Sequence, residues 1–166
     1  MIDESYLKSV IKDFRMYKSL GERAMAQVPS DDDLGAALGP ESNSISVIVQ
    51  HISGNFRSRY RDFLTTDGEK ADRDRDGEFD ASGPVTRGRV LELWEHGWAV
   101  ALGALDSLTP GDLEKTITIR GEPMSAVHAL NRSVTHTAYH VGQIVYLAKH
   151  FASDRWTTLS MPKKKP

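Results

Sequence analysis

Cysteine is absent from the 166 residues of the chain. The protein therefore has no disulfide, no thiolate metal ligand and no cysteine nucleophile of its own. Any metal ion must be bound by histidine, aspartate or glutamate, and any thiol in its chemistry must come from outside.

Long apolar runs, a signal-peptide core and an excess of one charge are also missing. No uninterrupted apolar run approaches the roughly 20 residues of a membrane span. Asp3 and Glu4 stand near the start, with no apolar signal-peptide segment behind them. The formal net charge of −2 offers no global electrostatic reason to bind nucleic acid or an anionic membrane. We therefore expect a cytoplasmic protein with no nucleic-acid partner and no membrane association.

Four segments carry apolar residues at spacings of three, four and seven, which predicts amphipathic helices. Their expected ranges are about 3–28, 44–65 (capped by Asn43 or Ser44), 86–108 and 124–151. Residues 116–120 alternate like a short strand, and Pro123 suits the first turn of the last helix. We predict an all-α protein with one domain, 1–166, forming a four-helix bundle with a short strand before the fourth helix.

The connection between the second and third predicted helices, residues 66–84, is long and highly charged. A loop of this length in a compact domain is functional or disordered, and it permits a crossover between helices. Asp72, Asp74 and Asp76 resemble the opening of a calcium-binding EF-hand loop, but Gly83 occupies the twelfth position, where a glutamate is required. We expect an arginine–aspartate network that orders this loop against the bundle.

Three histidines form the candidate metal site. His136 and His140 are four residues apart and share one face of the last helix. His51 occupies the corresponding flank of the second helix. Three neutral imidazoles leave a divalent metal with its full charge and at least one free position. Periodicity alone also allows these to be ordinary, partly buried histidines, whereas His128 is expected at the surface.

Other polar residues share these flanks and are candidates for the second shell or for substrate binding. Asn55 lies beside His51, and Gln143 lies near His140. Arg132 precedes His136 by one helical turn, where it could bind a substrate carboxylate or form a structural ion pair. A carboxylate that the sequence does not locate is a further second-shell candidate.

Much of the chain resembles the DinB/YfiT-like superfamily of metal-binding four-helix bundles, and more closely a bacterial branch of unknown function. The segments that carry this resemblance are residues 42–51, 54–59, 62–70, 73–74, 78–79, 136–144 and 156–162. The resemblance implies an up-down-down-up bundle, frequent homodimers, and a divalent metal, usually zinc or nickel. In the superfamily, the metal ligands correspond to His51, His136 and His140.

Characterised members of that superfamily include S-transferases and isomerases that use bacillithiol or mycothiol. By resemblance we expect a metal-dependent enzyme, an S-transferase or related hydrolase that uses an external low-molecular-weight thiol. The alternative is a non-catalytic, dimeric metal-binding or stress-related binding protein in which the metal is structural. The resemblance assigns no catalytic residue and no substrate.

Overall fold

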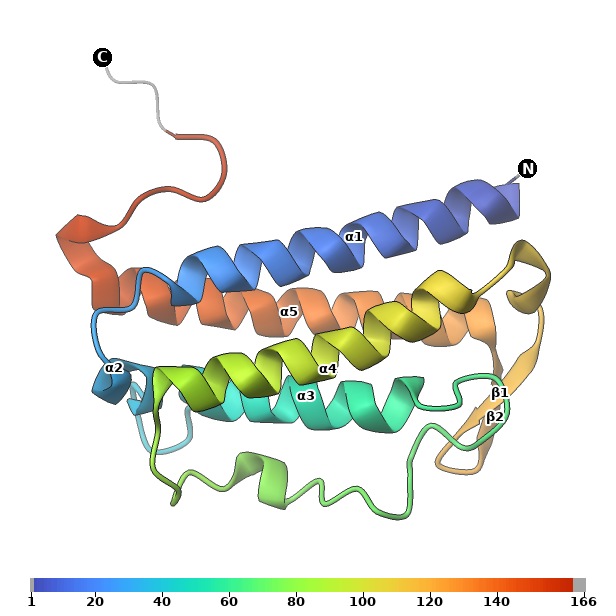
Figure 1. Ribbon diagram of the computed structural model, residues 1–166, viewed down its shortest axis with the longest axis horizontal. Coiled ribbons are helices and arrows are strands. Elements are labelled where there is room, and N and C mark those ends of the chain that lie inside the picture. Colours follow the sequence, from blue (N-terminus) through green and yellow to red (C-terminus); the bar gives the residue numbers. More distant parts are fainter. Residues whose placement is uncertain (1, 163–166) are drawn as a thin grey trace.

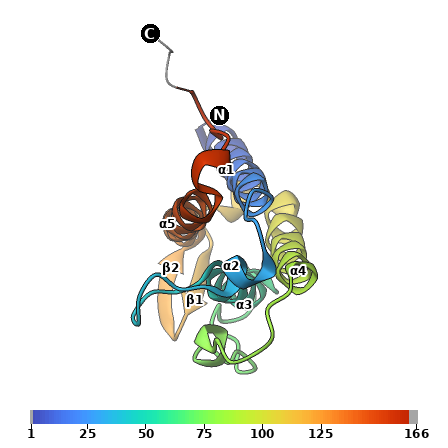
Figure 2. The ribbon, with the colours of Figure 1, turned by 90° about the vertical axis from the view of Figure 1, so that its left-hand side faces the viewer.

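The computed structural model describes residues 2–162, and four long helices make up most of it. They lie side by side around a common core, as the end view shows (Figure 2). α3 and α4 run in one direction, and α1 and α5 run in the other (Figure 1). The mainly helical class expected from the sequence is confirmed. The long helices are α1 (Ile2–Met25), α3 (Ile45–Tyr60), α4 (Arg87–Ser107) and α5 (Ala126–Ala152).

Smaller elements join the long helices. These are the short helix α2 (Asp31–Gly35), the strands β1 (Thr116–Ile119) and β2 (Glu122–Ser125), and three 3-10 turns at Gly77–Phe79, Pro110–Asp112 and Ser153–Arg155. None of the helices within residues 2–162 is long and apolar enough to cross a membrane.

Three of the long helices begin at a hydroxyl cap. The side chains of Ser44, Thr86 and Ser125 accept hydrogen bonds from backbone N–H groups three residues further on, at the starts of α3, α4 and α5. Such caps satisfy N–H groups that have no partner within the helix. The beginning of α3, which carries His51, is thus determined by local chemistry that the sequence already displays.

α3 packs against α4 at very short range because residue 97 is glycine. A Cβ atom at Gly97 would lie 2.7 Å from the Cα of Ser53, well inside van der Waals contact. On the core side of α3, the ring of Phe56 meets that of Trp98 edge-on, with centroids 4.9 Å apart. These contacts fix the rotation of α3 and therefore the direction in which His51 points.

The expected end of the second helix, near residue 65, is wrong. α3 stops at Tyr60, and Asp62 adopts a positive φ of 52°. Phe63 remains buried, but it reaches the core from the turn rather than from a continuing helix. Its apolar side chain extends the helical periodicity in the sequence without extending the helix.

The start of the last helix also differs from expectation. Pro123 lies in β2, paired with Thr118 of β1, and α5 begins only at Ala126. Arg120 and Gly121 form the two-residue turn, with φ values of 57° and 76°. Two consecutive residues with positive φ match the twist of a β-hairpin. Proline is tolerated here because a two-stranded sheet consists of edge strands. Residues 31–35, which lie between the first two predicted helices, form the short helix α2 behind the Ser30 cap.

The segment between α3 and α4 follows the surface of α3 and is anchored to it. Gln50 Nε2 donates to the carbonyl of Gly77 at 2.7 Å, and Ser58 Oγ donates to the carbonyl of Gly68 at 2.8 Å. At the hairpin, the Asp67 carboxylate accepts hydrogen bonds from the N–H groups of Arg120 and Gly121 at 2.9 and 2.8 Å. This long connection is therefore ordered, and it links α3 to the hairpin.

Candidate metal centre

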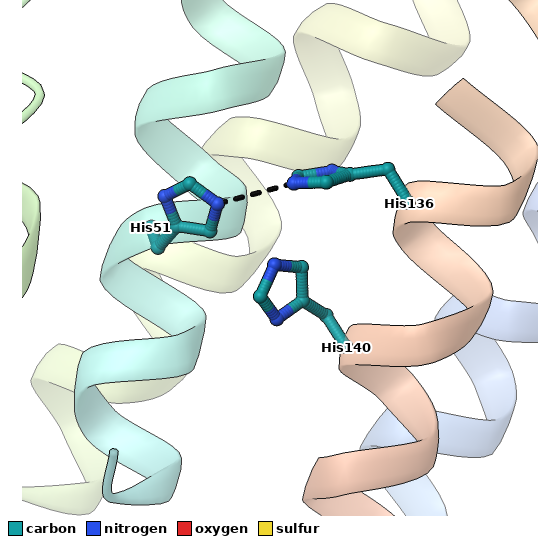
Figure 3. A group of neighbouring side chains, drawn as sticks. All are labelled: His51, His136 and His140. Carbon is teal, nitrogen blue, oxygen red and sulfur yellow. Dashed lines mark hydrogen bonds between the residues drawn. The ribbon is translucent and has the colours of Figure 1, made fainter. Parts of the chain in front are cut away.

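Three imidazole rings meet between α3 and α5. Figure 3 shows His51 on α3 pointing toward His136 and His140, which project from successive turns of α5. The ligand atoms of the three rings all lie within 4.8 Å of one another, and His51 Nε2 is 3.2 Å from His136 Nε2. Two nitrogens bound at about 2.1 Å to a tetrahedral metal ion would lie about 3.4 Å apart. The distance between these two nitrogens is therefore close to that between two ligands of one ion.

A buried carboxylate orients His51. Nδ1 of this ring lies 2.9 Å from Oε2 of Glu78, and both side chains are almost fully buried. Since a carboxylate only accepts hydrogen bonds, the proton of His51 belongs on Nδ1. Its Nε2 then carries a lone pair that faces the other two histidines, as in carboxylate–histidine–metal arrangements.

Gln143 orients His140 in the same way. The ring nitrogen Nδ1 lies 2.9 Å from Oε1 of Gln143, one helical turn further along α5. His140 Nε2 is buried and has no hydrogen-bond partner among the described residues. A buried nitrogen without a partner is costly and calls for an explanation, such as an ion. Its position beside the other two rings supplies that explanation.

The electrostatic surroundings keep the rings of α5 neutral. Burial, reinforced by the nearby His140 and His51, lowers the pKa of His136 to about 3. Burial and His51 lower the pKa of His140 to about 4, although its hydrogen bond to Gln143 opposes the change. Neutral imidazole is the form that binds metals, so both rings are in the binding form at neutral pH.

Glu78 is the residue beside the histidine cluster that sequence reasoning did not locate. Arg73 holds it with two hydrogen bonds, Nε to Oε1 at 2.7 Å and Nη2 to Oε2 at 2.8 Å. Burial raises the pKa of Glu78, but the hydrogen bonds from Arg73 and His51 outweigh that effect and lower it. The carboxyl group is therefore ionised. Metal-bound histidines commonly donate a hydrogen bond to a carboxylate, which predicts that such a residue exists. The 66–84 segment contains many acidic residues, so the sequence does not identify which one it is.

The ion-pair network of the loop is built differently from the expected arginine–aspartate pattern. Arg61 and Asp72 do pair, at 2.6 Å, but at the exposed surface. The buried part uses glutamates, because Glu69 accepts from Arg73 at 3.2 Å and from Arg59 at 3.0 Å. The longer glutamate side chains reach inward from the loop to α3.

Glycine at position 54 makes room for the Glu78 carboxylate. A Cβ atom there would lie 2.2 Å from Oε1 of Glu78 and 2.5 Å from its carboxyl carbon. Gly54 sits inside α3, where glycine costs about 1 kcal/mol relative to alanine. The space that it leaves on the α3 surface allows the carboxylate to reach His51.

The three imidazoles open onto a cavity of about 300 Å³. The remaining sequence candidates line it: Asn55, Arg132 and Gln143. Arg132 does not form the structural ion pair considered as an alternative, since its one polar contact within residues 2–162 is Nη1 to Met124 Sδ at 3.7 Å. His128 is exposed on α5 and takes no part in the cluster.

The arrangement fits a divalent metal ion. The donors are borderline imidazole nitrogens, which suit zinc and the later first-row metals. Hydrogen bonds at Nδ1 direct the lone pairs of His51 and His140 inward, and the orphaned Nε2 of His140 gains a partner if an ion binds. Three protein ligands beside a cavity are typical of sites that keep a coordination position free for another molecule.

Comparison with known proteins gives a family but no activity. No curated protein and no solved structure matches the chain. A family model described as "Protein of unknown function (DUF1572)" matches residues 1–165, a range that includes the three histidines, Glu78 and Gln143. The chain belongs to this family of proteins of unknown function, DUF1572.

Proposed function

We propose that this protein is a divalent-metal-dependent enzyme, a thiol-dependent S-transferase or a related hydrolase. The observation that carries the proposal is the convergence of three imidazoles on one cavity, two of them oriented through Nδ1, with a buried Nε2 of His140 that has no partner among the described residues. His51, His136 and His140 are the proposed ligands, and zinc or nickel is the proposed metal. The resemblance to the DinB/YfiT-like superfamily supports both the ligand set and the choice of metal. The opposed directions of α3 and α5 agree with the bundle that this resemblance implies (Figure 1).

The chemistry divides between the metal and the protein. A bound divalent ion acidifies a thiol or water molecule in its coordination shell, which supplies a nucleophile near neutral pH. Glu78 and Gln143 keep the lone pairs of His51 and His140 directed inward. The cavity beside the imidazoles offers room for the reaction partner. Because the chain has no cysteine, the thiol of an S-transfer reaction would be an external small molecule.

Two measurements test this proposal in sequence. Elemental analysis of the purified protein is expected to find about one divalent ion per chain, and His136→Ala is expected to lose it. His128→Ala is the matched control, since this histidine is exposed on the same helix and lies outside the cluster. Unchanged metal content in His136→Ala would refute the site.

Activity is then tested with metal-loaded protein and a panel of low-molecular-weight thiols and electrophiles. The expected result is turnover that requires metal and disappears in His136→Ala. Absence of turnover across the panel, with the metal fully bound, would count against the S-transferase.

The second candidate is a non-catalytic, dimeric binding protein in which the metal braces the bundle. One observation favours it: the ligands join α3 to α5, and Glu78 joins the 66–84 loop to the same site. A bracing ion would add its binding free energy to stability. A large fall in melting temperature on chelation, without turnover, would favour this candidate. Small destabilisation together with turnover would favour the enzyme. A homodimer is proposed for either case and is tested by light scattering.

A further inference from the structure

The cavity continues from the imidazoles toward the β-hairpin, where two of its polar side chains, Asn55 and Arg132, pair with no other polar side chain of the described residues except the Met124 sulfur. Asn55 lies one helical turn after His51 on α3, and Arg132 lies one turn before His136 on α5. Because α3 and α5 run in opposite directions (Figure 1), both residues lie on the hairpin side of the metal site. Ile119 of β1 also lines this end.

Asn55 carries a side-chain amide that faces the cavity and has no hydrogen bond within the described residues. Its side chain lines the cavity, the residue is only 8% exposed, and no partner for it exists within residues 2–162. Its amide atoms remain accessible from the cavity, so water or a bound molecule can hydrogen-bond to them. A polar atom of a bound molecule would take the place of that water.

Arg132 differs from the other arginines around the cavity. Arg59, Arg73 and Arg120 each donate to Glu69. Arg132 contacts no carboxylate in the described part of the chain, and its single polar contact is with the sulfur of Met124. Its planar guanidinium is therefore free to donate two parallel hydrogen bonds, the geometry that a carboxylate accepts best.

The charged side chains that line the cavity are all positive. Five arginines line the cavity, and no aspartate or glutamate does: Arg59, Arg73, Arg75, Arg120 and Arg132. Glu69 and Glu78 balance part of this charge from behind the wall. Apolar side chains, Phe63 and Ala129 among them, complete the surface at the hairpin end. The wall therefore favours a small anion with an apolar stem.

We propose that the hairpin end of this cavity binds the carboxylate of a small acidic substrate. Arg132 holds the carboxylate, and the Asn55 amide hydrogen-bonds to a polar atom of the same molecule. The other end of the molecule reaches the three imidazoles. One helical turn spans about 5.4 Å, so two to four carbon atoms separate the carboxylate from the reacting atom. The proposal rests on the proposed function, because it places the reacting end at the metal site.

The test compares two thiols that differ in charge and match in size: 3-mercaptopropionate and 3-mercapto-1-propanol. Protein loaded with cobalt(II) is titrated with each thiol, and sulfur-to-cobalt charge-transfer absorption reports binding. The wild type is expected to bind the carboxylate thiol about tenfold more tightly, a difference of about 1.4 kcal/mol. Arg132→Gln is expected to lose this preference and to keep the affinity for the alcohol.

Arg57→Gln is the matched control. Arg57 is exposed on α3, has no ion-pair or hydrogen-bond partner within the described residues, and does not line this cavity. The control variant is expected to retain the tenfold preference. Equal affinities of the wild type for both thiols would overturn the proposal, as would a preference that persists in Arg132→Gln.

A second measurement separates this proposal from the proposed function. If neither thiol binds the cobalt protein, the open metal position is refuted, and the anion site is then decided with metal-free protein and propionate. Side-chain NMR signals of Arg132 are expected to shift and saturate in the wild type. Absence of any shift would overturn the carboxylate site, whatever the metal does.

Discussion

Replacing Glu78 with glutamine probes the link between the charged loop and the metal site. The substitution keeps the shape of the side chain and removes its charge. In the wild type, the carboxylate accepts two hydrogen bonds from Arg73 and one from His51. The amide of glutamine has one acceptor oxygen, and its NH₂ group would face another donor. Either Arg73 or the Nδ1–H of His51 therefore loses its acceptor.

The size of the effect follows from the burial of this cluster. Removing one partner of a buried ion pair costs about 3–5 kcal/mol. Arg73 retains its contact with Glu69 at 3.2 Å, which offsets part of that loss. We therefore expect the free energy of unfolding of the metal-free protein to fall by about 2–3 kcal/mol. Metal affinity is expected to fall about 10- to 100-fold, because His51 loses the group that fixes its tautomer.

Urea denaturation with a chelator present measures the stability change, and competition with a chromophoric chelator measures metal affinity. Glu69→Gln is the matched control. Glu69 belongs to the same loop and also contacts Arg73, but it touches none of the three histidines. This control is expected to lose stability and to keep metal affinity. Wild-type metal affinity in Glu78→Gln would refute the reasoning, as would an equal loss of affinity in both variants.

Two further predictions concern glycine and pH. Gly54→Ala should destabilise the protein by about 1–3 kcal/mol, because its Cβ would overlap Glu78. Gly103→Ala, in an exposed part of α4 with open space around it, should instead stabilise by about 0.5–1 kcal/mol; equal effects in urea denaturation would contradict the proposed role of Gly54. The metal-free protein should be fully stabilised by its histidines above about pH 6.5, their pKa in an unfolded chain. It should lose that stability as the pH falls toward 4, since the pKa values of His136 and His140 are lowered to about 3 and about 4. An unfolding free energy that stays constant between pH 7 and pH 4.5 would contradict this reading.

Local patterns predicted much of the fold and the histidine cluster. The cap at Ser44 and the apolar stripe behind it define where α3 begins and which face it buries. The four-residue spacing of His136 and His140 fixes their shared face on α5. Once two amphipathic helices pack through their stripes, the flanks beside those stripes meet. The position of His51 near His136 and His140 can therefore be predicted without knowing the conformation of the loops.

What the sequence did not predict depends on contacts between distant residues. Glu78 became part of the site through the path of the 66–84 loop, which Gln50 and Arg73 determine from α3 and from within the loop. Proline is compatible both with the first turn of a helix and with an edge strand. Pro123 lies in a strand because its segment pairs with β1, where Thr118 is its partner. Phe63 falls at the spacing expected of the next apolar residue on the helix, but the chain has already left the helix at Asp62, which has a positive φ.

The two hydrogen bonds of the His51 ring differ greatly in the length of chain that they close. Glu78 is 27 residues away, whereas His136 is 85 residues away. Loop-closure entropy grows with the logarithm of length, so the longer closure costs about 1 kcal/mol more. During folding, the loop can therefore dock on α3 and set the ring before α5 arrives. Contacts that form so late act mainly on the rate of unfolding. An ion bound by all three histidines would thus prolong the lifetime of the native state and change the folding rate little.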